Sequence, residues 1–317
     1  MMNDLVTVIK EHDNFALVTH INPDGDALGS VFALNMALLT LGKKSNVILM
    51  ADMPKKYVFE EFKAEYIPVQ DTGKDYGCVI AVDCADINRL GDAKALFKEA
   101  PITVNIDHHS SNNGFAQINA VVLEPSCGEI IFDLICALDV PVDRDIASAL
   151  YIAISSDTGN FTYENTSPRT FERCAVLAGS GVPVAKIANY LYNAKTYEAT
   201  MLIGKVISNL RLFHDGKVAV TQVTMNELRE TGASAEDCET VINYARDIDT
   251  VEFAVFIRQF KEKTYKVSFR SKENIDVMEI AKRFGGGGHV RASGCTMSGD
   301  LYDIRDTILS IAKEFFG

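Results

Sequence analysis

Short apolar runs alternate with segments of helical spacing along the N-terminal half of the chain. Each run is bounded by polar or turn residues, which is typical of a buried strand. The runs predict strands at residues 15–19, 45–50, 78–82 and 102–106. Apolar residues three and four apart predict helices at 27–41, 92–98, 126–138 and 144–156. This alternation favours an α/β domain with a doubly wound, mostly parallel sheet.

The pattern changes toward the C-terminus. Helices are expected at 170–179, 183–192 and 196–210, before strand-like segments at 218–223, 251–260 and 264–270. The last two segments bracket a short polar turn and predict a hairpin. Further helices are expected at 235–246, 276–284 and 301–316. We therefore expect a first domain over 1–192, a helical linker over 193–212, and a smaller α/β domain with a mixed sheet over 213–317.

Acidic and imidazole side chains follow the predicted strands of the first domain. They lie after the first, third and fourth strands and after the helix at 144–156, and they are His20, Asp24, Asp26, Asp83, Asp107, His108, His109 and Asp157. The carboxyl ends of parallel strands meet at the edge of an α/β sheet that binds ligands, so we expect these side chains to lie close together. A simpler alternative makes Asp26 a helix cap and Asp24 a turn residue, but it gives His20 no role.

A bound cation would explain this cluster. Several carboxylates in one place repel one another and raise one another's pKa values, and divalent ions remove that cost. Carboxylate and imidazole ligands without thiolate fit Mn²⁺, while Mg²⁺, Fe²⁺ or Zn²⁺ are alternatives. The number of donors favours two ions, about 3.5–4 Å apart, that share a carboxylate and a water and activate that water for attack on phosphorus.

A glycine-rich segment, Gly285–Gly294, lies between the last two predicted helices. Consecutive glycines let backbone N–H groups approach a phosphate, so Gly286, Gly287 and Gly288 are candidate phosphate ligands. His289 and Arg291 follow directly and can add charged hydrogen bonds. Arg270 and Ser271, at the end of the predicted hairpin, are weaker candidates for the same pocket. The alternatives are a flexible glycine linker and a solvated strand end.

Composition narrows the class of partner. The net charge of −12 argues against binding of long duplex nucleic acid, which favours a basic face. Seven scattered cysteines without a C-x-x-C pair favour reduced thiols. The N-terminus has no signal-peptide pattern, and no apolar run is long enough to span a bilayer. We therefore expect a cytoplasmic protein without a membrane partner.

The chain resembles the DHH phosphoesterase family at four motifs. These are His20-Ile-Asn-Pro-Asp24-Gly-Asp26, Val-Asp83, Asp107-His108-His109 and Ser-Asp157-Thr-Gly, in the family's order. The segment Gly285–Gly294 resembles the G-G-G-G-H segment of the DHH-associated C-terminal domain. The compact two-domain form looks most like the bacterial oligoribonuclease and 3′-phosphoadenosine-5′-phosphate (pAp) phosphatase subgroup.

The resemblance implies a role for each matching residue. His20 and Asp24 would hold one Mn²⁺, and Asp83 would bridge to the second ion. That second ion would be held by Asp26, His108 and Asp157. Asp107 would orient a neighbouring histidine, and His109 would face the scissile phosphate as donor or acid. The active site would lie in the cleft between the two domains.

The resemblance also implies an activity. The expected enzyme is a Mn²⁺-dependent phosphoesterase that uses a metal-bridged hydroxide to cleave RNA of about two to five nucleotides to mononucleotides, and pAp to AMP. Such a protein would act on short RNA, dinucleotides or pAp as a homodimer. A soluble phosphodiesterase for cyclic di-AMP or pApA is the alternative enzyme. A non-catalytic nucleotide sensor is the alternative of another class, although such proteins usually lose a ligand and here each matching ligand is present.

Overall fold

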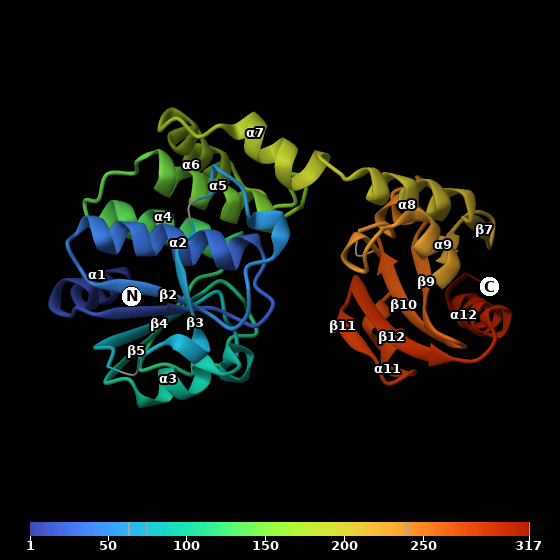
Figure 1. The fold of residues 1–317 in the computed structure, drawn as a ribbon, viewed down its shortest axis with the longest axis horizontal. Helices are drawn as coiled ribbons and strands as arrows, with labels where there is room; N and C mark the ends of the chain where they lie inside the picture. The colour runs from blue at the N-terminus through green and yellow to red at the C-terminus, as the bar shows by residue number, and fades with distance from the viewer. Residues whose placement is uncertain (63, 74, 239, 317) are drawn as a thin grey trace. The chain divides into compact units, whose positions relative to one another are not determined.

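The computed structural model describes residues 1–62, 64–73, 75–238 and 240–316. The chain divides into two compact units, Met1–Ala194 and Lys195–Gly317 (Figure 1). Each unit is an α/β domain built on its own sheet. The expected fold class, a mostly parallel sheet followed by a mixed one, is confirmed.

The sheet of the first domain has the strand order β3-β2-β1-β4-β5-β6, and its neighbouring strands pair in parallel. Its strands are β1 (Phe15–Val18), β2 (Ser45–Leu49), β3 (Tyr66–Pro68), β4 (Cys78–Val82), β5 (Ile102–Asp107) and β6 (Ile118–Val121). The four expected strands form the centre of the sheet. The edge strands β3 and β6 were not expected, because they are short and carry little of the apolar pattern that marks the central strands.

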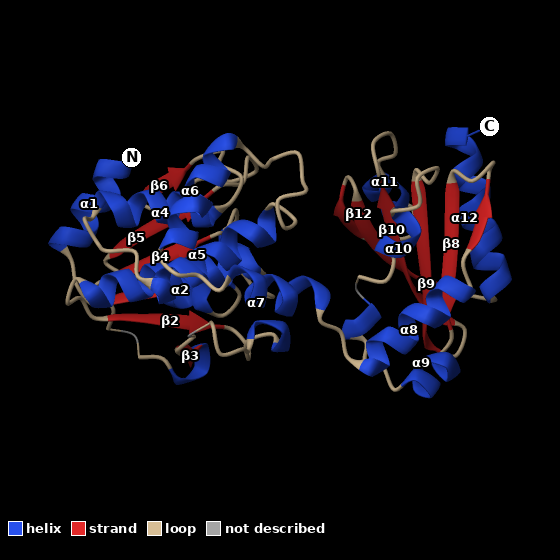
Figure 2. Ribbon diagram, turned by 90° about the horizontal axis from the view of Figure 1, so that it is seen from above, coloured by secondary structure: helices blue, strands red, loops and turns tan. Residues whose placement is uncertain are grey.

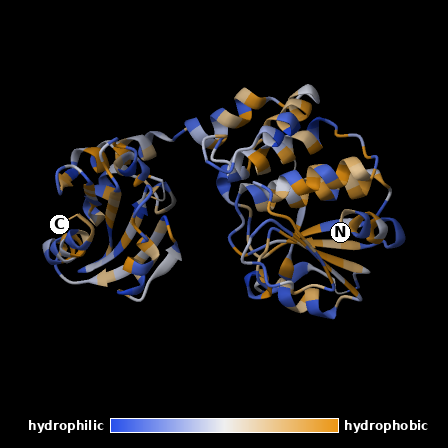
Figure 3. Cartoon of the chain, turned by 180° about the vertical axis from the view of Figure 1, so that it is seen from behind, coloured by the Kyte–Doolittle hydropathy of each residue, from blue (hydrophilic) through white to orange (hydrophobic). Residues whose placement is uncertain are grey.

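Helices cover both faces of this sheet. Figure 1 shows α2, α4 and α5 on one face and α3 on the other. The helices of this domain are α1 (Met2–Glu11), α2 (Gly25–Thr40), α3 (Ala93–Glu99), α4 (Cys127–Ala137), α5 (Arg144–Asp157), α6 (Pro168–Gly179) and α7 (Val184–Ala188). Short 3₁₀ or π turns span Lys55–Tyr57, Val69–Asp71, Ile87–Leu90 and Asn189–Asn193. Figure 3 shows the strands of this sheet as largely hydrophobic, as burial on two sides requires.

The strand order reverses direction at the centre of the sheet. From β1 the chain first builds outward through β2 and β3, and it then returns to place β4, β5 and β6 on the other side of β1. In sheets of this kind, ligands bind beyond the carboxyl ends of the strands at the point of reversal. His20 follows β1 and Asp83 follows β4, so the predicted ligands lie at this point.

Helices α2 and α5 pack closely because glycines face small side chains. A Cβ atom added at Gly29 would overlap the carbonyl oxygen of Ala149 and lie 2.8 Å from Cβ of Ala153. A Cβ atom added at Gly25 would lie 2.7 Å from Cβ of Ser156. The two helices carry Asp26 and Asp157, so this close packing fixes how far apart those two carboxylates lie.

The second domain has a mixed sheet of order β11-β12-β10-β9-β8-β7 (Figure 2). Strands β8 and β9 are parallel, and the other neighbouring pairs are antiparallel. The strands are β7 (Arg211–Phe213), β8 (Val218–Val223), β9 (Phe253–Lys261), β10 (Thr264–Ser271), β11 (Gly287–His289) and β12 (Ala292–Ser298). The helices are α8 (Tyr197–Ser208), α9 (Met225–Thr231), α10 (Asn243–Arg246), α11 (Val277–Lys282) and α12 (Leu301–Phe316).

Two core layers flank this sheet. Helices α11 and α12 pack on one face through Val277, Ile280 and Ile308. On the other face Leu202 and Val206 of α8 are fully buried, so the helix in the expected linker segment packs as part of this domain. The expected hairpin is present as β9 and β10.

Two local expectations in this domain were wrong. The segment 235–246 was expected to be one helix, but it holds only a 3₁₀ turn at Glu236–Cys238 and the short α10. No strand was expected in the glycine-rich segment, but Gly287–His289 forms edge strand β11, which pairs with β12. Among the described residues, no single helix is long and apolar enough to cross a membrane, although the bent pair Pro168–Gly179 and Val184–Asn193 meets the criterion by length and composition.

The substitution Gly29→Ala should lower the free energy of unfolding by about 1–3 kcal/mol, because the added methyl group has to displace the backbone of α5. The matched control is Gly179→Ala at the end of α6, where an added Cβ meets no described atom within 4 Å. The control should leave stability within about 1 kcal/mol of the wild type. Urea unfolding followed by circular dichroism measures both variants, and equal losses would contradict the packing argument.

Candidate metal centre

The loop between β1 and α2 and the first turn of α2 together carry three of the predicted ligands. His20 is buried, and its Nδ1 lies 2.8 Å from the carbonyl oxygen of the next residue. Asp24 is the N-cap of α2 and accepts a hydrogen bond of 3.0 Å from the backbone of Ala27. Asp26 therefore lies in the first turn of the helix and is not its cap, so the simpler alternative assigned the two aspartates wrongly.

Asp26 is fully buried and is held in place by the start of α4. Its Oδ2 accepts a hydrogen bond of 2.6 Å from the backbone N–H of Cys127, and its Oδ1 accepts one of 2.8 Å from that of Gly128. The hydroxyl of Ser30 adds a third at 3.1 Å. The first N–H groups of a helix have no partner within it and favour negative charge, so α4 orients this carboxylate.

Asp83 lies at the centre of the site, one residue beyond the end of β4. Its φ of 55° is left-handed, a conformation that aspartate tolerates better than most residues. The side chain is 2% exposed, and among the described residues its Oδ1 has no donor at ordinary hydrogen-bond geometry, since Nε2 of His108 lies 3.5 Å and Nδ1 of His109 lies 3.6 Å away. A buried carboxylate oxygen without a donor is costly, so its environment fits a bound cation.

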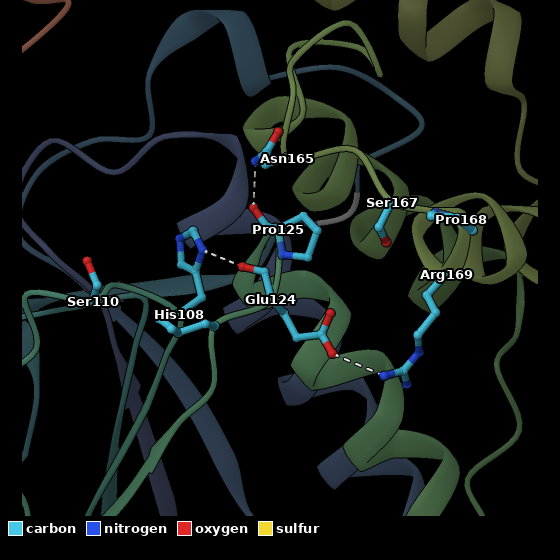
Figure 4. A pocket seen from close by; sticks show the side chains of 9 residues that line it. His108, Ser110, Glu124, Pro125, Asn165, Ser167, Pro168 and Arg169 are labelled. Carbon is cyan, nitrogen blue, oxygen red and sulfur yellow. Dashed lines mark hydrogen bonds and ion pairs between the residues drawn. The ribbon is translucent and has the colours of Figure 1, made fainter.

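Nε2 of His108 faces three carboxylates. It lies 3.3 Å from Asp157, 3.5 Å from Asp83 and 3.7 Å from Asp26. Its Nδ1 lies 3.1 Å from the carbonyl oxygen of Glu124, which accepts a hydrogen bond from Nδ1 (Figure 4). This hydrogen bond leaves Nε2 to bind a metal. Bonds of about 2.1 Å place neighbouring ligands on one ion about 3.0–3.4 Å apart. The observed spacing is close to that of ligands around a cation and longer than that of good hydrogen bonds.

The predicted ligands form three overlapping groups in which the ligand atoms lie within 4.8 Å of one another. The groups are His20 with Asp24 and Asp83; Asp26 with His108 and Asp157; and Asp83 with His108 and His109. Because Asp83 belongs to two of them, its two oxygens can serve two neighbouring ions. The first two groups contain the residues that the family resemblance assigns to the two ions, and that assignment stays a prediction.

The charges of the site show why a cation fits. Burial, and then the carboxylates of Asp83 and Asp157, raise the pKa of Asp26 well above its usual value. Burial raises the pKa of Asp157 to about 6, although His108 opposes this shift. Burial lowers the pKa of His108, but hydrogen bonding to Asp83 and the nearby carboxylates outweigh it and raise the pKa to about 10. The acids therefore compete for positive charge, which a divalent ion would supply.

His109 lies beside this cluster and is held by a second carboxylate. Its Nδ1 lies 2.8 Å from Oδ1 of Asp107, which is fully buried, while the imidazole is 36% exposed. That hydrogen bond raises the pKa of His109. The side chain of Asn112 donates to Oδ2 of Asp107 and to Oδ1 of Asn105. Asn112 thus positions Asp107, and the sequence signals it only as part of a polar turn.

The predicted phosphate ligands of the second domain lie around one hairpin. Gly287, Gly288, His289 and Arg291 are exposed, and Gly286 is half-buried. A Cβ at Gly286 would overlap the carbonyl of Gly294, so this glycine has a packing role in the hairpin as well.

Three further contacts bear on these candidates. The hydroxyl of the buried Ser271 donates to the carbonyl of Ile275 at 2.6 Å, and Arg291 donates to the same carbonyl at 2.9 Å. Arg270 donates to the carbonyl of Phe269 at 3.0 Å. Phosphate binding by the seven candidates stays a prediction.

The substitution Asp83→Asn should abolish tight metal binding, because it removes the charge shared by two ligand groups. We expect Mn²⁺ affinity to fall more than about 100-fold, beyond the loss seen for residues that only orient a ligand. The control is Asp139→Asn, because Asp139 is exposed and has a similar φ of 56°. Titration calorimetry and elemental analysis after gel filtration measure the effect, and near-normal metal content in Asp83→Asn would contradict it.

Metal affinity should rise with pH. Ions bind the deprotonated ligands, so protons on Asp157 (pKa about 6) and His108 (pKa about 10) compete with the metal. Between about pH 6 and pH 9, one proton leaves His108 when the site of Asp26, His108 and Asp157 is filled, and the affinity of that site should rise about tenfold per pH unit. Calorimetry in buffers of different ionisation enthalpy counts the protons released. An affinity that does not change over this range would show that the imidazole is not a ligand.

Comparison with known proteins finds two matching domain families and a similar full-length relative. The model described as the DHH family, N-terminal domain, matches residues 14–154, and the DHHA1 domain matches residues 215–316. The chain is 32% identical over 303 residues to the bifunctional oligoribonuclease and PAP phosphatase NrnA of Thermus thermophilus, over 94% of this chain and 89% of that protein.

Solved structures agree on the fold. An exopolyphosphatase-related protein from Bacteroides fragilis superposes with a TM-score of 0.90 at 24% identity, over 99% of this chain and 96% of that one. Exonuclease RecJ bound to manganese superposes with a TM-score of 0.58 at 14% identity, over 100% of this chain and 95% of that one. The resemblance found at the four motifs is thereby confirmed: the chain belongs to the DHH phosphoesterase family and is an enzyme with a DHH domain followed by a DHHA1 domain.

Proposed function

We propose that this enzyme uses two Mn²⁺ ions to hydrolyse short RNA oligonucleotides to mononucleotides and pAp to AMP. The observation that carries the proposal is the arrangement of three carboxylates around Nε2 of His108, with His109 beside them. The name of the Thermus thermophilus relative supports the substrates, and the manganese bound to RecJ supports the metal. Mg²⁺ or another divalent ion is the alternative cofactor.

In this proposal the residues around Asp83 hold the ions, and His109 acts on the substrate. When bound, two metal ions would supply Lewis acidity toward the phosphate and would lower the pKa of a water molecule at the site. Asp107 holds Nδ1 of His109, so the other ring nitrogen can carry a proton toward the phosphate. The hydrogen bond to Asp107 raises the pKa of His109, which favours the protonated imidazole. The new O–P bond forms from water, the ester O–P bond breaks, and the leaving oxygen takes a proton.

The second domain is proposed to hold the terminal phosphate of the substrate. The net charge of −12 gives no broad basic track for RNA, so the enzyme should gain few contacts from a long chain. The proposed contacts are the backbone of Gly286, Gly287 and Gly288 and the side chains of His289, Arg291, Arg270 and Ser271. A fixed terminal phosphate would favour substrates of about two to five nucleotides.

A substrate panel tests the proposal. Purified enzyme with Mn²⁺ is given pAp, RNA from dinucleotides to about 20-mers, cyclic di-AMP, pApA and pyrophosphate, and products are separated by chromatography. We expect a trimer and pAp to be cleaved, and a 20-mer to be cleaved much more slowly than the trimer. Turnover of cyclic di-AMP or pApA alone would establish the alternative phosphodiesterase. No turnover of any substrate by metal-loaded enzyme would favour a nucleotide sensor.

The second-domain contacts have their own test. His289→Ala should lower kcat/KM on a trimer by a factor that corresponds to about 1–3 kcal/mol of transition-state stabilisation, because a phosphate of the substrate loses its partner. Gly287→Ala should lower kcat/KM in the same way, because a Cβ atom would keep the phosphate from approaching the backbone N–H groups. This variant should keep its fold, because an added Cβ there meets no described atom within 4 Å. Metal content should not change in either variant.

The control is His12→Ala, at the C-cap of α1 in the other domain, which should keep the wild-type rate. Wild-type kinetics on the trimer in both His289→Ala and Gly287→Ala would contradict a phosphate site at this hairpin.

A further inference from the structure

A pocket of about 680 Å³ opens beside His108 in the first domain. Figure 4 shows the side chains that surround it, which come from the segment after β5, the segment between β6 and α4, and the segment that leads into the first turn of α6. The pocket and the candidate metal centre share His108, so a group bound in the pocket is next to a phosphate held at the metals. Its volume lies in the range of sites that bind small organic ligands.

The walls of this pocket are largely apolar. Leu123, Pro125 and Pro168 line it. Leu123 is 75% exposed, which makes it the most exposed leucine among the described residues, and it lies three residues before Ser126, the N-cap of α4. An exposed apolar side chain in a concave site next to reactive groups points to a ligand with an apolar face.

The charged residue at the edge of the pocket is already neutralised. Arg169 lies 3.3 Å from a carboxylate oxygen of Glu124 and 3.4 Å from one of Asp133. The buried Arg173 pairs with the same two acids and with Glu129. Three carboxylates thus face two guanidinium groups, so this wall offers no net positive charge to a second phosphate.

Hydrogen bonds hold the pocket in shape and connect it to the metal centre. The side chain of Asn165 donates to the carbonyl of Pro125 at 3.2 Å (Figure 4). It also donates to the carbonyl of Asp157 at 3.1 Å. Ser167 caps α6 and forms a capping box with Thr170. The backbone carbonyl of Glu124 accepts the hydrogen bond from His108. The wall is therefore preformed, which lowers the entropic cost of binding.

We propose that this pocket binds a nucleoside attached to the reacting phosphate, with the base against Leu123 and the two prolines. A base has flat apolar faces, and its polar edge can reach Ser110 and Asn165 at the rim. The neutralised arginines disfavour a second phosphate at this position, so the pocket selects nucleotides over pyrophosphate and polyphosphate. This inference rests on the proposed function and adds the residues that recognise the nucleoside.

The test compares Leu123→Ala with the wild type and with Leu39→Ala, all as the full chain loaded with Mn²⁺. Leu39 is 51% exposed near the C-terminal end of α2, whereas Asp26 lies at the start of that helix, so this control removes a similar side chain far from the site. Calorimetry measures the binding of AMP and of inorganic phosphate to each protein. Kinetics on a dinucleotide give KM and kcat separately.

Leu123→Ala should weaken AMP binding and raise KM about five- to twentyfold, the loss expected for the apolar contact of a few methyl groups. Binding of phosphate, metal content and kcat should change less than about twofold, and Leu123→Met should restore AMP binding because it restores apolar area. Leu39→Ala should behave as the wild type.

The outcomes separate the two proposals. If Leu123→Ala binds AMP as the wild type does, or if the wild type binds AMP no more tightly than phosphate, the nucleoside pocket is wrong even when dinucleotides are cleaved. If AMP binding depends on Leu123 but no nucleotide is hydrolysed, the pocket stands and the proposed function fails.

Discussion

The candidate metal centre of the first domain depends on three carboxylates that face one imidazole. Asp26, Asp83 and Asp157 all lie within 3.7 Å of Nε2 of His108, and the first two are almost completely buried. One imidazolium cannot balance three carboxylates, so two of the acids keep raised pKa values. A divalent ion removes this conflict by replacing protons. Binding of a metal at this site would therefore be coupled to the release of protons.

The fold brings these groups together through backbone positions that are far apart in the sequence. Asp83 follows a central strand, whereas Asp26 begins one helix and Asp157 ends another. The first N–H groups of α4 hold Asp26, and the close packing of α2 on α5 sets its separation from Asp157. The geometry of the ligands therefore depends on small residues such as Gly29 that contact no ligand themselves.

The sequence predicted the central strands and the clustering of the acids and imidazoles that follow them, because a buried strand leaves a strong apolar pattern and a charged residue directly after it stands out. The edge strands β3 and β6 were missed because short, half-exposed strands carry no such pattern. Asn112 was missed because a polar turn does not reveal that its amide reaches Asp107. The need for glycine at Gly25 was missed because Ser156, which excludes a Cβ there, is distant in the sequence. Long-range packing of this kind is specified only once the fold exists.

The net charge of the chain also limits which substrates such a site can bind. A chain with a net charge of −12 repels long polyanions, so the attraction for phosphate has to come from ions and a few local cations. Each further phosphate of a long substrate would add repulsion without a new partner. The remaining affinity then has to come from uncharged parts of the substrate, and the apolar wall at Leu123 beside neutralised Arg169 suits such a part. Under the proposed function, selectivity for small nucleotides would follow from where the chain lacks positive charge as much as from where it would hold metal.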